Sequence, residues 1–330
     1  MKRKYSKENI SKQMLEWVKI LFPLNRSIAG ADNYKTLTFL KKQLPSIKIK
    51  YFKSGKKVFD WVIPNEWHIK DAYIKNLNGK KIIDFKNNNL HVVNYSFPVN
   101  KTISKKELFN HLNYLKNKPN AIPYLTSYYK KYWGFCVSFR DFKSKFKGNN
   151  FKVFIDSNFN SKGFMNYGEL IIKGRSKKEI LIHTYICHPS MANNETSGPI
   201  VCTYLAKYFK KRKNYYTYRF IFTPETVGAI AYINKNLKNL IKNIIGGYVI
   251  TCVGDNKHFS FLESKNKSIS NRVAEKTFKE LNIRYKKYSF LKRGSDERQY
   301  NAPGIDLPIG AIMRSKPGTF KEYHTSKDDF

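Results

Sequence analysis

The sequence has few cysteines, few acidic residues and no long apolar run. Its four cysteines, Cys136, Cys187, Cys202 and Cys252, lie far apart among apolar neighbours and form no Cys-x-x-Cys pair. Neither a disulfide framework nor a thiolate zinc site is therefore indicated, and all four are interpreted as small core residues. No apolar stretch approaches the roughly 20 residues that a membrane-spanning helix needs. We expect a cytoplasmic protein without a membrane span.

Acidic residues are scarce beside basic ones. There are 24 Asp and Glu residues against 62 Lys and Arg residues, which gives a formal net charge of +38. The excess is nearly all Lys and is spread along the whole chain, without a dense Arg block, a zinc finger or an RNA-binding aromatic signature. We therefore expect no specific nucleic-acid partner, although nonspecific attraction to anions at low salt is expected. Charge-driven binding stays open as a third interpretation.

What the chain does have is enough length and apolar content for a real core. It has 330 residues, of which 41% are hydrophobic and 15% aromatic. Two helices are predicted between about residues 8 and 46, with Asp32 or Asn33 as the N-cap of the second. Short β-type runs separated by turn signals follow from about 48 to 100. The Ser104–Glu107 capping box then predicts a short helix.

From about residue 151 onward, apolar strand-like runs alternate with helical patterns. Helices are predicted over 197–210, 227–239 and 269–281, with strands such as "EILIHTYI" and "GGYVITCVG" between them. Alternation of this kind is typical of an α/β domain with a mostly parallel central sheet covered by helices. The earlier β-type runs predict a small inserted β subdomain.

Four polar residues follow the predicted strands at their carboxyl ends, where α/β sheets collect ligands. His188 follows "EILIHTYIC", Glu225 follows "YTYRFIFTP", Asp255 follows "GGYVITCVG", and His324 lies in a loop after "LPIGAIM". Imidazole and carboxylate without thiolate are the ligands of zinc in hydrolases. One carboxylate can stay off the metal and act as general base toward a water that the cation acidifies.

Each of these residues also has an ordinary structural role open to it. His188 could simply end a strand, Glu225 could stabilise a helix N-terminus, and Asp255 occupies a position typical of turns. His324 could be a surface residue. His183, inside the strand, is interpreted as a core histidine rather than a ligand. Cys187 is a weak candidate nucleophile. Only the joint occurrence at several strand ends favours a metal site.

Many segments together resemble a bacterial aminopeptidase-like family, long classified as a domain of unknown function and associated with polysaccharide biosynthesis. The segments include "LFPLNRSIAG", "VFDWVIPNEW", "ICHPSMANNETSGP", "FTPETVGAIAYI", "TCVGD", "GSDERQY" and "EYHTS", and the likeness extends through nearly the whole chain. The family is similar to the co-catalytic zinc aminopeptidases. The resemblance implies a three-layer zinc-aminopeptidase-like (phosphorylase/hydrolase-like) domain over 1–47 and 130–330, with a small β-rich insertion over 48–129.

The resemblance also implies roles for individual residues. His188, Asp255 and His324 match metal-ligand positions, and Glu225 matches the general base. In the loop "GSDERQY", Asp296 and Arg298 match polar contacts to substrate.

Three departures from the family pattern bear on activity. Where the related two-zinc enzymes have a bridging aspartate, this chain has Asn194, whose neutral amide cannot neutralise two cations. Asn194 and the neighbouring Glu195 could each contact the metal or support its ligands. Thr226 stands where the two-zinc enzymes have a glutamate, so we expect one zinc rather than two. Relatives are expected to continue after the His324 loop with a winged-helix-like domain that this sequence lacks.

Two functions from different classes follow from this pattern. The first is a zinc-dependent aminopeptidase-like hydrolase that cleaves an amide bond of a small peptide or of an amino-sugar or amino-acid conjugate. The second is a catalytically degenerate aminopeptidase-fold protein that acts as a binding module in surface-glycan assembly. The sequence determines neither the substrate nor the oligomeric state.

Overall fold

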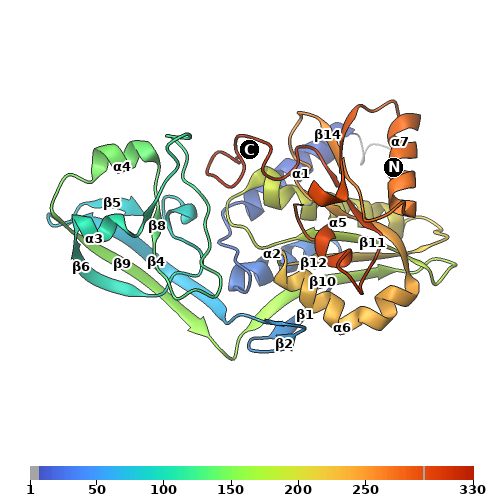
Figure 1. Cartoon of the computed structure of the whole chain (residues 1–330), viewed down its shortest axis with the longest axis horizontal. Helices are drawn as coiled ribbons and strands as arrows, with labels where there is room; N and C mark the ends of the chain where they lie inside the picture. Colours follow the sequence, from blue (N-terminus) through green and yellow to red (C-terminus); the bar gives the residue numbers. More distant parts are fainter. Residues whose placement is uncertain (1–6, 293) are drawn as a thin grey trace.

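The computed structural model describes residues 7–292 and 294–330 and shows two lobes (Figure 1). The larger lobe is built on an eight-stranded sheet. Its strands lie in the order β1 (Lys48–Lys53), β10 (Phe164–Ile172), β12 (Thr217–Thr223), β11 (Glu179–Tyr185), β13 (Ile244–Ile250), β16 (Ile309–Met313), β14 (Phe259–Leu262) and β15 (Tyr285–Tyr288). The α/β prediction is confirmed.

The centre of this sheet is parallel and its margins are mixed. Strands β12, β11, β13 and β16 run parallel to one another. Strand β10 pairs antiparallel with β12, and β14 pairs antiparallel with β16. Six of the seven residues of β11 are buried. A strand that is buried along nearly its whole length is expected where helices cover both faces of a parallel sheet.

Alternate residues of the central strands enter two different cores, as the twofold repeat of a strand requires. Ile182 and Phe220 pack with helices α1 (Lys7–Leu21), α2 (Ala31–Gln43) and α5 (Ser197–Lys210) on one face. Leu181 and Ile221 pack with α6 (Val227–Asn243) on the other. Helix α7 (Ile269–Glu280) packs near the β14 edge through Phe278. The helices predicted over these segments are confirmed.

The smaller lobe contains a four-stranded antiparallel sheet. Its strands lie in the order β5 (Lys81–Asp84), β4 (Glu66–Asn76), β9 (Asn150–Asn160) and β6 (Val99–Ser104). Helices α3 (Lys105–Phe109) and α4 (Phe139–Lys145), the short turn η2 (Asn89–His91) and the pair β7 (Leu112–Asn113) and β8 (Phe135–Cys136) complete it. The Ser104 side chain accepts the Glu107 N–H, as the capping box predicts.

The expected boundaries of the insertion at residues 48 and 129 are wrong at both ends. Strand β1 pairs with β10 in the large sheet, and β9 pairs with β4 and β6 in the small one. The small sheet therefore extends from Glu66 to Asn160. Local sequence patterns mark a strand but do not identify its partner, and both errors concern partners far away in the sequence. In the sequence, a hairpin of β2 (Lys57–Val58) and β3 (Trp61–Val62) follows β1 of the large sheet and precedes β4 of the small sheet.

Short elements shape the rim of the large sheet. The π-helical turn η3 (Ala192–Thr196) leads into α5, and the turn η4 (Phe290–Lys292) and helix α8 (Glu297–Tyr300) precede β16. The N-cap of α2 is Gly30, not Asp32 or Asn33. Those two side chains instead accept the N–H groups of Asn25 and Ser27, which fixes the connection between α1 and α2.

Candidate active site

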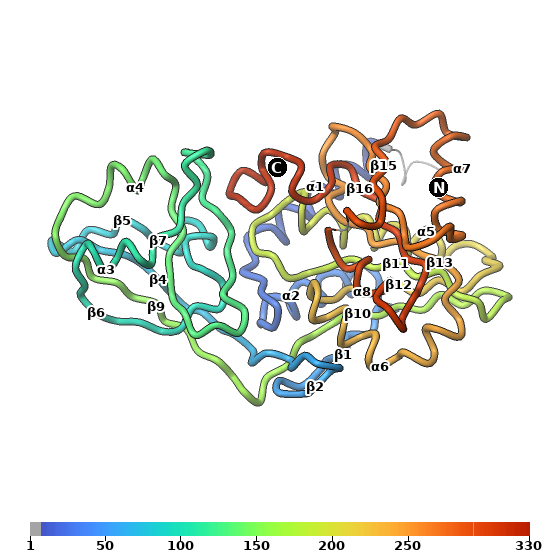
Figure 2. The backbone as a smooth tube through the Cα atoms, viewed as in Figure 1, coloured from blue at the N-terminus to red at the C-terminus, as the bar shows by residue number. Residues whose placement is uncertain are grey.

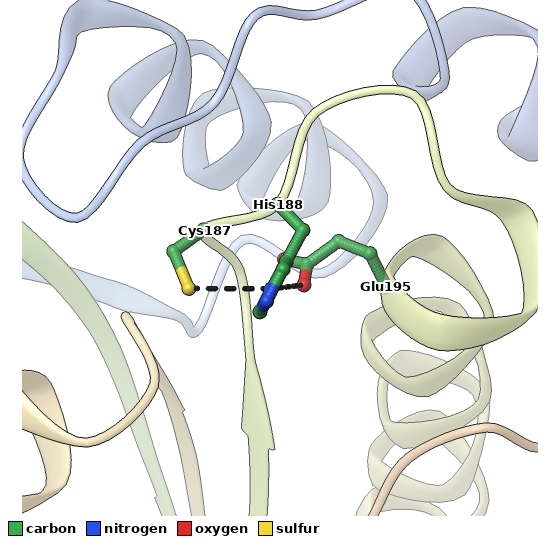
Figure 3. A group of neighbouring side chains, drawn as sticks. All are labelled: Cys187, His188 and Glu195. Carbon is green, nitrogen blue, oxygen red and sulfur yellow. Dashed lines mark hydrogen bonds and ion pairs between the residues drawn. The ribbon is translucent and has the colours of Figure 1, made fainter. Parts of the chain in front are cut away.

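His188 follows the end of β11 and is 4% exposed. Its carbonyl oxygen accepts a hydrogen bond from Arg26 Nε at 2.9 Å, which fixes the backbone of the turn. Its Nδ1 lies 2.8 Å from Glu195 Oε2, and Figure 3 shows the two side chains meeting above the strand end. A carboxylate on Nδ1 makes that atom a donor and leaves Nε2 as the nitrogen that binds a ligand when it loses its proton. Nε2 lies 3.6 Å from Glu225 Oε2.

Glu195 provides the buried negative charge of this group. It lies on η3, is 2% exposed, and its Oε1 has no hydrogen-bond partner among the described residues. Arg26 Nε is 3.9 Å from that oxygen. Burial alone would lower the pKa of His188, but its neighbours Cys187, Tyr124 and Glu195 raise it well above its ordinary value. Glu195 thus has the position of a group that orients the imidazole.

Cys187 lies on the other side of the same ring. Its Sγ is 3.5 Å from His188 Nδ1 and accepts the backbone N–H of Glu225 at 3.2 Å. Burial raises the pKa of the thiol to about 11, so it stays protonated at neutral pH. A buried thiol of this kind is a poor nucleophile. Among the described residues, Cys187, His188 and Glu195 form the one acidic, histidine or cysteine group whose donor atoms lie within 4.8 Å of one another.

Glu225 stands between the end of β12 and the start of α6. Its Oε1 accepts a hydrogen bond from Ser295 Oγ at 3.0 Å, and its side chain keeps 21% exposure. Burial raises the pKa of this carboxyl to about 7, opposed by His188 and supported by the nearby Asp296 charge. A carboxylate with a pKa near neutrality, next to an imidazole, can accept and return a proton.

The backbone beside Glu225 is strained and is held by Asp296. Thr226 has φ 62°, which is unusual for a β-branched residue. Its N–H donates to Asp296 Oδ1 at 2.7 Å, and Asp296 Oδ2 lies 3.2 Å from His183 Nε2. His183 Nδ1 in turn lies 2.6 Å from the Tyr300 hydroxyl. His183 is a hydrogen-bonded core residue, as the sequence indicates.

The side chain of Asp296, predicted to contact substrate, is fully buried in this structure, and that role stays a prediction. Its position supports the turn that carries Glu225. Arg298 is exposed on α8. Burial raises the pKa of Tyr128 in the smaller lobe, and the positive charges of His188 and Arg298 oppose that shift. Arg298 thus lies on the same side as the site, and its contact with substrate stays a prediction.

His324 approaches His188 from the C-terminal loop. The two ring centroids lie 5.1 Å apart, and the His324 ring stacks on Tyr323 at 3.9 Å. Burial, followed by the positive charge of His188, lowers the pKa of His324 to about 2. The ring is therefore neutral at physiological pH, which is the form that binds a metal ion.

The smaller lobe holds the His324 loop in place. Tyr124 N–H donates to the His324 carbonyl at 2.8 Å, and Ser326 N–H donates to the Ile122 carbonyl at 2.8 Å. The Tyr124 ring lies 5.0 Å from the His188 ring and 5.3 Å from the His324 ring. Figure 2 shows the C-terminal segment passing between the two lobes. Tyr124 of the smaller lobe therefore contacts both imidazole rings and the backbone of His324.

The structure does not bring Asp255 to the imidazoles. Its Oδ2 accepts hydrogen bonds from Asn193 Nδ2 at 3.0 Å and from the Ser315 N–H at 3.2 Å. It lines a separate cavity with Phe320 and Asp328. The expected ligand role of Asp255 is therefore not met here. A residue that turns away after a strand end is indistinguishable in sequence from one that turns inward.

Asn194, on η3, lies between the two imidazole-bearing segments and β13. Its side chain is 1% exposed; Oδ1 accepts from the Tyr185 hydroxyl at 3.4 Å and lies 3.6 Å from Cys252 Sγ. Its Nδ2 has no hydrogen-bond partner among the described residues. The sequence indicates a core residue at Cys252, at the end of β13, and nothing in its local pattern reveals that it contacts Asn194.

A family model described as a domain of unknown function (DUF4910) matches residues 15–330. The chain belongs to the DUF4910 family. A Clostridium acetobutylicum relative is 44% identical over 310 residues, which are 94% of this chain and 70% of the relative. Its name includes the words "polysaccharide biosynthesis protein with aminopeptidase-like domain". The resemblance seen in the sequence is thereby confirmed.

Comparison with two solved structures identifies the fold. A Clostridium acetobutylicum protein whose name includes the word peptidase is 43% identical, with a TM-score of 0.93 over 98% of this chain and 76% of that one. A zinc aminopeptidase from Bacillus subtilis is 13% identical, with a TM-score of 0.70 over 98% of this chain and 89% of that one. The fold is that of the zinc aminopeptidases. None of the helices in the described ranges combines the length and apolar character needed to cross a bilayer.

Proposed function

We propose that the protein is a zinc-dependent hydrolase of amide bonds. The supporting observation is the approach of two imidazoles from distant segments, with His188 Nε2 only 3.6 Å from Glu225 and the rings of His188 and His324 at 5.1 Å. Two imidazoles beside a carboxylate form a donor set that suits zinc. The buried Glu195 Oε1, which has no hydrogen-bond partner among the described residues, is further evidence of a polar ligand beside His188.

His188 and His324 would hold the ion, with the Asn194 amide oxygen as a neutral third donor. When bound, zinc polarises a carbonyl and makes a nearby water more acidic. The remaining steps, orienting the imidazole and transferring the proton, would be carried out by side chains of the protein. Glu195 orients the His188 ring through Nδ1. Glu225 accepts the water's proton at Oε2 and returns it to the leaving amine, while Ser295 Oγ holds its other oxygen.

The substrate in this proposal is a peptide N-terminus or an acyl group on an amino sugar or amino acid. The peptide choice follows the zinc aminopeptidases of the same fold, and the sugar conjugate follows the biosynthetic name of the Clostridium relative. We propose one ion rather than two because Asn194 and Thr226 remove two acidic side chains that would balance a second cation. The protein is proposed to act in the cytoplasm.

The proposal is tested by metal content and one substitution. Purified protein is expected to contain about one zinc per chain by elemental analysis. Glu225→Ala is expected to keep that zinc and to lose turnover of an aminoacyl amide substrate by at least about a hundredfold, the scale of general-base catalysis. Glu322→Ala, which removes a carboxylate from the C-terminal loop that pairs with Lys257, is the matched control. Turnover that survives in Glu225→Ala would sink the assignment.

Asn194 supports a second candidate function, a degenerate enzyme that binds its ligand without hydrolysis. The neutral amide stands on η3 beside Tyr185 and Cys252, where a carboxylate would strengthen a cation site. In this case Asn194→Asp is expected to create zinc affinity or activity that the native chain lacks. Native zinc binding with turnover, unimproved by Asn194→Asp, would exclude this alternative.

A further inference from the structure

A cavity separate from the candidate active site opens between the two lobes. It has a volume of about 710 Å³ and is walled by the α1–α2 connection, the first turn of α2, β4, β9 and the 85–89 segment. Ser190, two residues after His188, closes one side. Neither His188, His324 nor Glu225 lines it. The volume lies within the range of about 300–1,000 Å³ that small-molecule sites occupy.

The polar wall of this cavity is rich in amides. Five asparagines line it, Asn25, Asn87, Asn88, Asn89 and Asn158. Three of them, Asn25, Asn87 and Asn158, make no side-chain hydrogen bond within the described ranges, and the buried Asn89 Oδ1 has no partner there either. Each amide offers both donors and an acceptor. A set of unused amides from several segments matches a ligand with many hydroxyl groups.

The charged wall is predominantly positive. Lys35, Lys70 and Lys86 line the cavity together with His68. Lys35 pairs with Asp32 at 2.7 Å and Lys86 lies 3.5 Å from Asp71, but both lysines are about two-thirds exposed. Lys70 has no ion pair among the described residues. Asp32, the one carboxylate in the wall, pairs with Lys35, so Lys70 and Lys86 leave the lining with an excess of positive charge.

Aromatic rings supply the apolar part of the wall. Phe22 and Phe85 are half-buried and Trp67 is buried, and they belong to different segments. Lys and Asn are common throughout this chain, so their presence alone decides little. Here, however, they converge with aromatic surface in one concave space made by both lobes. Apolar surface with a few convergent polar groups is the usual composition of a ligand site.

We infer that this cavity is a binding site for an acidic sugar, a hydroxyl-rich small molecule with a carboxylate. The amides would bind the hydroxyl groups, the aromatic rings would pack against the apolar face of the ring, and Lys70 would pair with the carboxylate. The site is distinct from the proposed zinc centre and does not depend on the proposed hydrolase activity. The shared wall at Ser190 places its occupant next to the loop that carries His188.

Calorimetric titration of the full-length chain tests this site. A hyaluronan tetrasaccharide, which carries carboxylates, is the acidic probe, and chitotetraose is a neutral probe of the same length. The acidic probe is expected to bind with Kd in the millimolar range or tighter and at least about tenfold more tightly than the neutral one. Lys70→Ala is expected to weaken acidic binding about tenfold, a change of about 1.4 kcal/mol. Asn158→Ala is expected to weaken it about threefold.

Two control variants test whether the acidic probe binds in this cavity and not elsewhere on the basic surface. Lys80→Ala removes an equal charge from an exposed turn of the same lobe, outside the cavity, and is expected to leave binding unchanged. Arg298→Ala tests binding near the candidate active site and is expected to have no effect. The proposal would be overturned if both probes bind equally or if neither binds at millimolar concentration. It would also be overturned if the control substitutions, and not Lys70→Ala, weaken binding of the acidic probe. Full competition by inorganic sulfate would also overturn it, because the site would then recognise charge alone.

Discussion

The two lobes contribute to the candidate site in different ways. The larger lobe supplies His188 and Glu225 from the ends of neighbouring parallel strands, where the backbone is fixed by the sheet. The smaller lobe supplies no candidate metal ligand, but its segment around Tyr124 bonds to the backbone of His324 and covers both imidazoles. The comparison indicates that the sheet positions the reactive groups and that the inserted lobe completes and encloses them.

The largest expected effects come from substitutions in the cores of the two lobes, which test whether the lobes are separate structural units. Phe220 belongs to the core of the large sheet and Phe151 to that of the small sheet, and both are almost fully buried. Either Phe→Ala substitution is expected to reduce the free energy of unfolding by about 3–5 kcal/mol, through lost burial and the cavity that remains. Hydrogen exchange measures where the loss occurs.

Phe151→Ala is expected to accelerate exchange chiefly in β4 and β9, and Phe220→Ala in β11 and β12. Ile103→Val, a smaller change in the same core as Phe151, is the graded control and is expected to cost about 0.5–1.5 kcal/mol. Equal acceleration in both sheets from either substitution would show that the lobes unfold as one unit.

The His324 loop is also attached to the larger lobe, through Asp328. Its carboxylate accepts the N–H groups of Asn193 at 2.7 Å and Asn194 at 2.9 Å. Burial nevertheless raises the pKa of Asp328 from 3.8 to about 6. A raised carboxyl pKa means that the native state binds the proton more tightly than the unfolded chain. Its contribution to stability is therefore full below pH 3.8 and is lost as the pH rises through 6.

Asp328→Asn is expected to remove this part of the pH dependence. The shift corresponds to at most about 3 kcal/mol, at about 1.4 kcal/mol per pKa unit. Urea unfolding of both proteins between pH 4 and pH 7, in metal-free buffer, measures it. Asp329→Asn, the exposed neighbour, is the control and is expected to run parallel to the native curve. Parallel curves for native protein and Asp328→Asn would show that Asp328 titrates normally.

The larger lobe also holds Glu225 through a buried side chain. Asp296→Asn replaces the acceptor of the Thr226 N–H with an amide that can still accept, but it removes the charge beside His183. Because Asp296 holds the turn that carries Glu225, kcat is expected to fall about ten- to a hundredfold with KM nearly unchanged. The corresponding loss of transition-state stabilisation is about 1.4–2.7 kcal/mol.

Steady-state kinetics and a pH–rate profile check this positioning role. The acidic limb of the profile is expected to move to lower pH in Asp296→Asn, because the Asp296 charge helps to raise the pKa of Glu225. Arg298→Ala is the matched comparison on the same short helix and is expected to change KM rather than kcat. A change in KM alone for Asp296→Asn would contradict the positioning role.

The sequence predicts the larger lobe better than the smaller one, for physical reasons. Apolar strands alternating with helices have strong local patterns, so the α/β core and the positions of His188 and Glu225 at strand ends follow from them. The predicted ligand role of Asp255 is not met, because the direction of a side chain after a strand depends on the turn. Here the Asp255 carboxylate is bound by Asn193 Nδ2 and the Ser315 N–H. Tyr124 is unpredictable, since its contact with the C-terminal loop joins segments that are remote in sequence.

The smallest expected effect concerns that contact and tests the inserted lobe directly. Tyr124 touches both imidazole rings with its side chain and bonds to His324 with its backbone. Tyr124→Ala removes the ring but keeps the backbone bond, so His324 gains freedom and zinc affinity is expected to fall about tenfold, or about 1.4 kcal/mol. Tyr124→Phe keeps the ring and is expected to bind zinc as tightly as the native chain. Competition with a chelating dye measures both affinities, independently of activity. If Tyr124→Ala binds zinc unchanged, the larger lobe alone positions the imidazoles, and the ring from the insertion only covers them.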